Sequence, residues 1–503
     1  MRTIMMQAAV TTALIASATA AHAAGTLKVG PGATYANPCA AVAAAQPNDV
    51  IEIAPGTYTD SCSIGVAGIT LKGVGGRPKI DLSGTDHPAQ YKGIYVVEAD
   101  GVRIENLELM GAHISDANGG NAAGIRVTGS DVVVHGCYIH DNQNGILGTE
   151  AKAGSNLTVE NTELAHNALG DGCNLGGCTH NIYVSFGKLV FQYNWSHDVA
   201  NDTADKGHLF KSRSKQNFIL YNRLTGQAGP DSYEVNLPNG GLTVLVGNVI
   251  QKGPNAGNPT LLSYGEEGLS NPDTRVFAVN NTFVNDRPGG LFMNLAGTST
   301  LTAHNNLFVG AGTVSNKGTL GVDNLSGMNP MFVDPATYDY RLKAGSPAID
   351  KGIAPGMADA FSLVPTFEYV HPTSSVPRKD DGKLDIGAFE LGTDLSGAGA
   401  DAGAGAHADG GGAGAGAGGG GGAPGSNSGG PAAPGAGQDD GGAPANDTAT
   451  DGEASGCAVS SATGGASGDG RTGRSTNHGA WLLALAVGLA AAWRARGGRA
   501  SAR

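Results

Sequence analysis

Residues 180–267 concentrate side chains that can bind anions and move protons. They include two imidazoles, a phenol, a pair of cations and several carboxylates, in a chain of 503 residues of which only 15% are charged. Cations can neutralise an anionic ligand, and a Lys, His or Tyr side chain with a shifted pKa can act as general base or acid. The sequence therefore predicts a site that binds an anion and transfers a proton. Its candidate members are His180, Asn181, Tyr183, His208, Lys211, Arg213, Glu234, Asn236 and Glu266.

Four short strand patterns carry these residues, at 181–185, 209–213, 232–236 and 261–266. Side chains alternate between the two faces of a strand, and neighbouring strands lie about 5 Å apart. If the apolar residues and Tyr233 point inward, alternation places Tyr183, Lys211 and either Glu234 or Asn236 in one outward row. The same alternation predicts that Asn181 and Arg213 point outward and that Glu266 and Glu267 lie in the turn beyond. His180 and His208, at the strand entrances, are predicted to point inward.

The strands belong to a repeat that covers residues 100–310. Each unit is a short alternating apolar strand followed by Asn or a small residue, and the units recur every 25–32 residues or so. No segment has a sustained helical pattern, the leucine-rich consensus is absent, and propeller blades need about 40 residues. A parallel β-helix remains, in which corner asparagines are structural, because stacked amides hydrogen-bond along the axis and tolerate left-handed backbone. The repeat centres are Asn106, Gly136, Asn161, Tyr193, Asn222, Asn248, Asn280 and Asn305.

Three stretches of the chain resemble the right-handed parallel β-helix proteins of the pectate-lyase-like superfamily. They are an opening segment at 27–58 with a capping helix at 38–45, the coils themselves, and closing segments at 340–350 and 385–390. The resemblance covers about residues 26–392. It implies an all-β domain at 25–392, a single-stranded right-handed parallel β-helix with an N-terminal helical cap.

Lyases of this fold cleave acidic polysaccharides by β-elimination, and the resemblance assigns roles on that basis. The enzyme neutralises a uronate carboxylate, removes the C5 proton and protonates the leaving oxygen. Lys211 is then the first candidate for the base, Arg213 neutralises or protonates, and His208 and Tyr183 follow as acid or alternate base. The remaining candidates, His180, Asn181, Glu234, Asn236 and Glu266, are assigned to substrate binding.

Loop aspartates next to these strands are candidate Ca²⁺ ligands. Asp202, Asp205 and Asp231 supply the carboxylate oxygens that Ca²⁺ prefers. Solvated loop acids that form turns are the alternative interpretation.

Three other functions remain open. A rigid solenoid on a spacer is also suited to a surface adhesin or a polysaccharide-binding protein without activity. A glycoside hydrolase needs paired carboxylates, but the Asp-Asp pairs at 380–381 and 439–440 lie outside the coils, and the Asp-Pro-His-Asp signature of a uronate epimerase is absent. A net charge of −13 argues against a nucleic-acid partner.

The ends of the chain predict export and display. Residues 1–24 have the positive start, apolar stretch and Ala-x-Ala site of a signal peptide. Many of the 82 glycines lie in 393–456, which we expect to be a disordered spacer. Residues 457–503 begin at Cys457, directly after Gly456, and contain a short apolar helix at 480–493 and trailing arginines. They resemble the myxobacterial C-terminal sorting tail; a simple membrane tether is the alternative. We expect a secreted monomer that is either anchored at the cell surface, on the outer-membrane side, or released outside the cell.

Cysteine spacing predicts two disulfides and one thiol. Cys39 and Cys62 flank the first coil, and Cys173 and Cys178 bracket a small loop, so each pair is a candidate disulfide in an oxidising compartment. Cys137 lies in a strand pattern and is expected to be a buried thiol.

Overall fold

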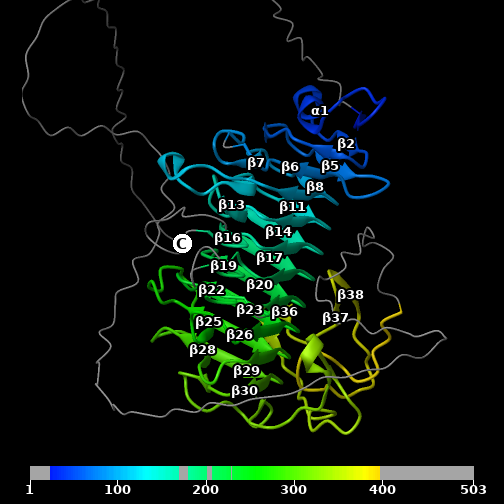
Figure 1. The fold of residues 1–503 in the computed structure, drawn as a ribbon. Coiled ribbons are helices and arrows are strands. Elements are labelled where there is room, and N and C mark those ends of the chain that lie inside the picture. Colours follow the sequence, from blue (N-terminus) through cyan, green and yellow to red (C-terminus); the bar gives the residue numbers. More distant parts are fainter. Residues whose placement is uncertain (1–22, 86, 169–178, 201–206, 228, 397–503) are drawn as a thin grey trace, which may run out of the picture. The chain divides into compact units, whose positions relative to one another are not determined.

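The chain forms a right-handed parallel β-helix, as predicted. The structure is a computed structural model that describes residues 23–85, 87–168, 179–200, 207–227 and 229–396. Each coil contributes one strand to each of three parallel sheets, named A, B and C here, and the coils stack from β1 to β32 along the solenoid (Figure 1). The fold class predicted from the repeat is confirmed.

Sheet A is formed, in order, by β1 (Thr26–Val29), β2 (Val50–Ile53), β5 (Thr70–Gly73), β8 (Arg103–Glu105), β11 (Val132–His135), β14 (Asn156–Glu160), β17 (Lys188–Gln192), β20 (Gln216–Leu220), β23 (Leu242–Val246), β26 (Arg275–Val279) and β29 (Thr300–His304). Sheet B is formed by β3 (Thr57–Tyr58), β6 (Lys79–Asp81), β9 (Glu108–Met110), β12 (Tyr138–His140), β15 (Glu163–Ala165), β18 (Trp195–His197), β21 (Arg223–Thr225), β24 (Val249–Lys252), β27 (Thr282–Asn285), β30 (Leu307–Gly310) and β32 (Leu325–Ser326). Sheet C is formed by β4 (Cys62–Ile64), β7 (Gly93–Val97), β10 (Ala123–Val127), β13 (Asn144–Thr149), β16 (Ile182–Ser185), β19 (Lys211–Ser212), β22 (Val235–Leu237), β25 (Thr260–Tyr264), β28 (Leu291–Leu295) and β31 (Thr313–Ser315).

Apolar rows run through the interior along the solenoid axis. In sheet A the register aligns Val134, Val159, Phe191 and Ile219 in successive strands, and all four are fully buried. Each such side chain removed from water contributes about 1.5–3 kcal/mol. The period-two pattern of the strands is thus explained by one face that packs into this core.

The two properties predicted for the corner asparagines, left-handed backbone and stacked amides, occur at two adjacent positions in the corner between sheets A and B. The first has left-handed backbone, as at Asn161 and Tyr221 with φ of 50° and 54°. The second carries a buried amide ladder: the Asn222 side chain donates to Asn248 Oδ1 at 3.0 Å, and Asn248 donates to Asn281 Oδ1 at 2.9 Å. The structural interpretation of the corner asparagines is therefore confirmed.

The N-terminal end of the solenoid is closed by a helix, as predicted. Helix α1 (Pro38–Ala44) begins after Asn37, whose side chain accepts the backbone N–H of Ala40 at 2.9 Å. The predicted Cys39–Cys62 disulfide joins this helix to β4. Cys137 is a buried free thiol, also as predicted.

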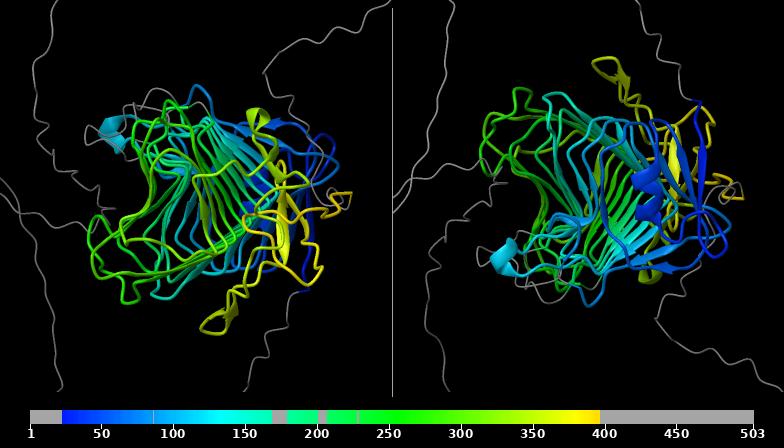
Figure 2. Two further views of the ribbon diagram at one scale, coloured as in Figure 1. Left: turned by 90° about the horizontal axis from the view of Figure 1, so that it is seen from below. Right: turned by 90° about the horizontal axis from the view of Figure 1, so that it is seen from above.

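The closing segment lies along a flank of the solenoid instead of over its end. We call residues 331–395 the C-terminal strap; it contains β33 (Phe332–Asp334), β34 (Asp339–Leu342), β35 (Met357–Ala358), β36 (Phe361–Ser362), β37 (Phe367–Val370), β38 (Ser374–Pro377) and the short helix η3 (Pro335–Thr337). Its side chains Tyr340 and Phe389 cluster with Val249, Val284 and Leu307 on sheet B. Figure 2 shows the strap in yellow beside the coils. The closing segments predicted at 340–350 and 385–390 belong to this strap, which covers apolar side chains of sheet B that point outward.

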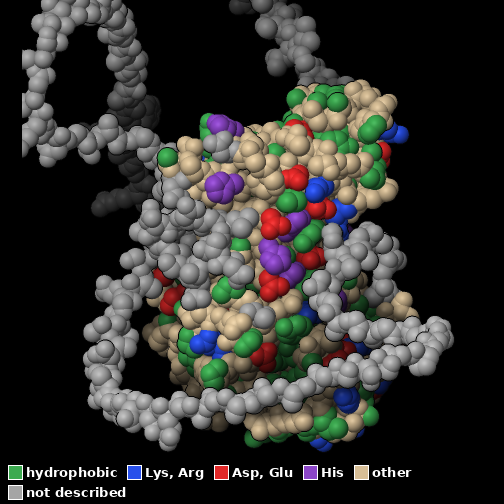
Figure 3. All heavy atoms as spheres, in the orientation of Figure 1, with side chains coloured by type: hydrophobic (Ala, Val, Ile, Leu, Met, Phe, Trp, Pro, Cys, Tyr) green, Lys and Arg blue, Asp and Glu red, His purple; other side chains and the backbone are tan. Residues whose placement is uncertain are grey.

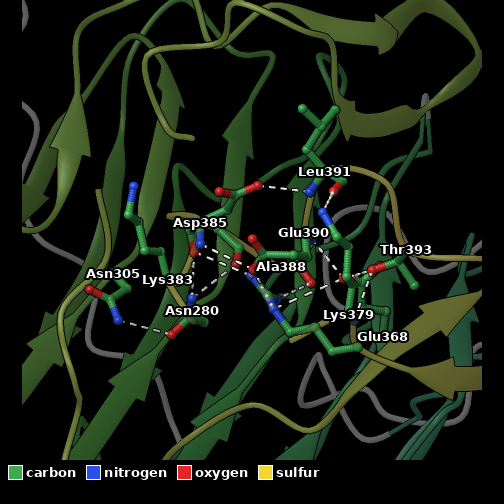
Figure 4. A network of polar contacts seen from close by, with 12 residues as sticks. Asn280, Asn305, Glu368, Lys379, Lys383, Asp385, Ala388, Glu390, Leu391 and Thr393 are labelled. Carbon is green, nitrogen blue, oxygen red and sulfur yellow. Dashed lines mark hydrogen bonds and ion pairs between the residues drawn. The ribbon is translucent and has the colours of Figure 1, made fainter. Parts of the chain in front are cut away.

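A polar network fixes the strap to the coils (Figure 4). Asn280 donates to the Asp385 backbone oxygen at 2.8 Å, and Asn305 donates to Asn280 at 3.1 Å. Within the strap, the buried Arg378 guanidinium pairs with Glu390 at 3.0 Å. Burial raises the pKa of Glu390, and the Arg378 charge opposes that shift.

Several predictions fall outside the described residues. They are the signal peptide, the glycine-rich spacer, the C-terminal tail with its apolar helix, and the Cys173–Cys178 pair. Among the helices that are described, none is long and apolar enough to cross a membrane.

Candidate active site on the outer face of sheet C

Residues of adjacent strands in sheet C form the outward row that alternation predicted, with Asn236 and not Glu234 as its third member. The register places Tyr183 beside Lys211, Lys211 beside Asn236, and Asn236 beside Ser263 in successive coils. Arg213 follows β19 directly, and its Nε donates to the Tyr183 hydroxyl at 2.7 Å. The structure therefore brings together three of the four predicted catalytic side chains, Tyr183, Lys211 and Arg213.

Lys211 is nearly buried although it lies on the outer face. Its side chain is only 7% exposed, and its amine lies 5.0 Å from the centre of the Tyr183 ring. Burial lowers the pKa of Lys211; Glu267 and Glu266 oppose this shift, and the neighbouring Arg213 adds to it. The net effect is a lysine that gives up its proton more readily than an exposed one.

Arg213 remains a cation held in a fixed direction. Burial alone would lower its pKa, but Tyr183 and Glu267 outweigh burial and raise it. Its Nη2 donates to Glu267 Oε2 at 2.5 Å, and Nη1 donates to the Asn239 side chain. Glu267 Oε1 also lies 3.8 Å from the Lys211 amine. One carboxylate thus sits between the two cations, and it comes from the protein itself.

His180 and His208 stack on each other at the entrance to these strands. Their ring centres are 4.5 Å apart, and the Nδ1 of His208 accepts the backbone N–H of Tyr233 at 3.3 Å. His180 Nδ1 likewise accepts the backbone N–H of His208 at 3.1 Å. Burial lowers the pKa of His208 well below its usual range, and the nearby charges of Lys211 and Lys252 add to this. His208 is therefore a neutral imidazole, which suits orientation of neighbouring groups better than proton donation.

Side-chain alternation fails at the strand entrances, where the chain turns the corner from sheet B to sheet C. Asn181 and Glu234 were expected outward, yet both are 0% exposed. Asn181 Nδ2 donates to Ser196 Oγ at 3.1 Å, in the corner beneath the sheet. Tyr233, expected inward, instead packs on the His208 ring at 5.1 Å. The predicted orientations of these three residues are wrong, since a corner rotates the backbone away from strand geometry.

A buried ion cluster supports this corner. The Lys252 amine lies 3.1 Å from Glu234 and 3.4 Å from Asp231, and all three side chains are fully buried. Burial raises the pKa of Glu234 well above its usual range, Lys252 opposes this, and Asp231 adds to it. Asp231 therefore faces a lysine and does not fit as a Ca²⁺ ligand.

Calcium stays a prediction for the other two aspartates. Asp202 and Asp205 lie outside the described residues. Within the described ranges, no three His, Cys, Asp or Glu side chains are grouped to hold a metal ion.

Part of the polar rim of the site lies in turns, where strand alternation does not predict the direction of side chains. Asn236 donates to Glu266, whose other oxygen accepts from Ser263 at 2.9 Å. Glu266 and Glu267 project from a turn between Gly265 and Gly268, whose φ values of 78° and 105° favour glycine. Glu267 was placed near the site but not among its members, and Asn239, Ser263 and Tyr233 were missed. The Gly-Glu-Glu-Gly pattern was the available signal for Glu267.

A second group of titratable side chains lies on the outer face of sheet B. His197 contacts Asp198 at 2.9 Å and Glu163 at 3.2 Å, and His140 contacts Asp141 at 2.6 Å and Glu108. Figure 3 shows histidine and acidic side chains gathered in a column on the face it presents. Each imidazole here is already bound by carboxylates, which distinguishes this group from the cationic site on sheet C.

Solved structures share the fold of this chain. Pectate lyase Pel9A matches with a TM-score of 0.51 and 17% sequence identity, over 73% of this chain and 96% of that protein. An alginate lyase from Paenibacillus sp. str. FPU-7 matches with a TM-score of 0.41 and 15% identity, over 58% of this chain and 97% of that protein. No protein-family model matches the chain, and no curated protein matches it in sequence. At 17% identity the likeness to Pel9A shows the parallel β-helix fold alone, and the activity has to be argued from the site.

Proposed function

We propose that the protein is a polysaccharide lyase that cleaves an acidic, uronate-containing polysaccharide by β-elimination. The observation that carries the proposal is the environment of Lys211: an almost buried amine with a lowered pKa, on the outer face of the sheet, next to a fixed guanidinium. A lysine that loses its proton easily can accept one from carbon, and the adjacent Arg213 can neutralise the carboxylate that acidifies that carbon. The fold shared with pectate lyase Pel9A supports the same class of reaction.

The arrangement accounts for each step of the elimination. Arg213 and Asn236 bind the uronate carboxylate, and the Lys211 amine takes the C5 proton. The electron pair of the C5–H bond forms the C4–C5 double bond, and the pair of the C4–O bond leaves with the oxygen. The Tyr183 hydroxyl, held by Arg213 at 2.7 Å, donates a proton to that oxygen. Proton exchange between Lys211 and Tyr183 restores both groups.

Glu267 supports the carboxylate-binding part of this scheme. Its two oxygens contact Arg213 and Lys211, so Glu267 occupies the guanidinium that binds the substrate carboxylate in the proposed mechanism. Substrate therefore has to displace Glu267, whose turn is bounded by Gly265 and Gly268 in left-handed backbone. Arg126, three coils away in the same row, is a further cation for a polymer that lies along the axis.

Lys211→Ala tests the proposal directly. The full chain is assayed on alginate, pectate, hyaluronan and chondroitin for release of unsaturated ends that absorb in the ultraviolet. We expect the variant to lose about 10²–10⁴-fold of the activity, the usual contribution of a general base. Lys215→Ala is the matched control, because Lys215 is exposed and pairs with Glu150; it should retain activity. Full activity of Lys211→Ala would remove Lys211 from the mechanism, and no turnover of any uronate polymer would favour a binding protein.

Two further features of the proposal come from the sequence alone. We propose that the protein is secreted and displayed at the cell surface through residues 457–503, and that Asp202 and Asp205 bind Ca²⁺. Activity measured with and without EDTA tests the calcium part, and fractionation of cells with an antibody against the solenoid tests the location.

A further inference from the structure

A pocket lies on the flank of the solenoid, between sheet B and the C-terminal strap. Its volume is about 290 Å³, near the lower limit of small-molecule sites. The walls combine one side chain of β21 with residues around η3, β34 and β37, among them Arg223, Tyr338, Tyr340, Arg341, Tyr369 and His371. None of these residues belongs to the outer face of sheet C, so the pocket is separate from the proposed active site.

Arg223 is a buried cation with no carboxylate partner among the described residues. It is 8% exposed; its Nη1 contacts His371 Nδ1 at 3.2 Å, and its Nε is buried without a hydrogen-bond partner. The guanidinium lies 5.3 Å from the Trp195 ring and 5.7 Å from the Tyr338 ring. Burial of a charge is costly unless it is paired. Aromatic faces offset part of that cost, and the guanidinium fork remains available to an anion.

The carboxylates near Arg223 are each bound elsewhere. Asp339 holds Arg341 through two contacts, at 2.8 Å and 2.5 Å. Asp198 binds His197 at 2.9 Å, and Asp286 accepts from Gln251 at 2.7 Å. Arg223 is thus the group of this pocket whose charge is left for a ligand.

The aromatic side chains indicate what else the ligand carries. Tyr338 has left-handed backbone, with φ of 60° and ψ of 25°, which is uncommon for a bulky residue and places its ring over Arg223. Rings with a polar tip pack against the apolar face of an amphipathic ligand and bind its hydroxyls at the edge. A sugar ring with one carboxylate satisfies both the rings and the guanidinium.

We infer that this pocket binds a single carboxylated sugar unit, a uronate, at a site remote from the catalytic face. The demand for a carboxylate comes from Arg223 itself, whereas the choice of a uronate rests on the proposed function. Such a site holds a polymer end or a released product on the flank of the solenoid while the catalytic face remains accessible.

Trp195 makes the inference measurable in the full chain. Calorimetric titration with glucuronate and galacturonate measures the affinity. Tryptophan emission reports whether the ligand binds at this pocket, because Trp195 contacts Arg223. The other two tryptophans, Trp481 and Trp493, belong to the C-terminal tail. We expect the emission to change on binding, and Trp195→Phe to abolish the change. Glucose and galactose should bind at least tenfold more weakly than the uronates. Acetate should also bind at least tenfold more weakly, and equal affinity for acetate would overturn the sugar assignment.

Variants separate this pocket from the active site. Arg223→Gln should weaken uronate binding at least tenfold. Arg341→Ala changes an exposed position and leaves the Asp339 carboxylate unpaired, so that it repels the uronate carboxylate. This variant should weaken uronate binding at least threefold, and it keeps the test valid if Arg223→Gln does not fold. Lys211→Ala should leave binding unchanged. Absence of millimolar uronate binding, or binding that Lys211→Ala removes and Arg341→Ala spares, would overturn the inference without bearing on catalysis, which the lyase assay measures separately.

Discussion

The amine of Lys211 lies on the outer face of sheet C yet is almost out of water, and its lowered pKa is what a general base requires. Its outward position follows from strand alternation, which predicted a row of Tyr183, Lys211 and either Glu234 or Asn236; the structure places Asn236 in that row. The sequence placed Glu267 only at the turn beyond the strand; its contacts with Arg213 and Lys211 depend on the path of a turn that contains two left-handed glycines. Charge at the site is therefore set by a residue outside the strand pattern.

Glu267→Gln should alter the pH dependence of the proposed elimination. The rate rises with pH as Lys211 loses its proton, and Glu267 raises the pKa of Lys211 by stabilising the charged amine. Without that carboxylate the pKa of Lys211 falls further, so the rising limb of kcat/KM should move to lower pH. KM should also fall severalfold, since the substrate carboxylate no longer competes with an internal one.

Glu150→Gln is the control for that profile, because it removes an exposed pair with Lys215 that does not contact Lys211. Glu150→Gln should leave the rising limb of the kcat/KM profile at the same pH. A limb that stays fixed in Glu267→Gln, or moves to higher pH, would contradict the assignment of Lys211 as the titrating base.

At the scale of elements, the corners of the coil decide where prediction succeeds and fails. Corner asparagines were predicted to stack and to adopt left-handed backbone, and both occur, although neighbouring residues share the tasks. At the corner between sheets B and C the same reasoning misplaced Asn181, Tyr233 and Glu234. A strand period carries no information on how far the backbone rotates at a bend, so contacts made there depend on the three-dimensional path.

Asn248→Ala should destabilise the solenoid markedly. The change leaves two buried donors of Asn222, its backbone N–H and its side-chain amide, without their acceptor. Each orphaned group costs roughly 1–3 kcal/mol, so we expect a loss of about 2–4 kcal/mol in unfolding free energy by denaturant titration. Asn118→Ala, at an exposed position, should change stability by at most about 0.5 kcal/mol. Equal effects of the two changes would show that the ladder does not stabilise the coils.

At the scale of the whole molecule, the strap explains why the domain extends beyond its last coil. The repeat ends near residue 326, yet Val249, Val284 and Leu307 on the outer face of sheet B are buried only because strap residues cover them. The sequence marked the strap as a closing segment but gave no direction for it. Strand periodicity alone does not distinguish a strand face that packs in the interior from an outer face that the strap covers, since both require apolar residues.

Truncation should therefore have opposite outcomes on the two sides of the strap. A fragment of residues 25–396 keeps the strap and its anchors, Asn280 to Asp385 and Arg378 to Glu390, and should unfold at the same temperature as the full chain. A fragment of residues 25–330 exposes the apolar flank of sheet B and should bind hydrophobic dyes and self-associate, as large exposed apolar patches do. Sedimentation and thermal unfolding of both fragments measure this. A stable, monomeric fragment of residues 25–330 would show that the coils fold and stay monomeric without the strap. The strap, and the pocket that it forms with sheet B, would then not be needed for stability.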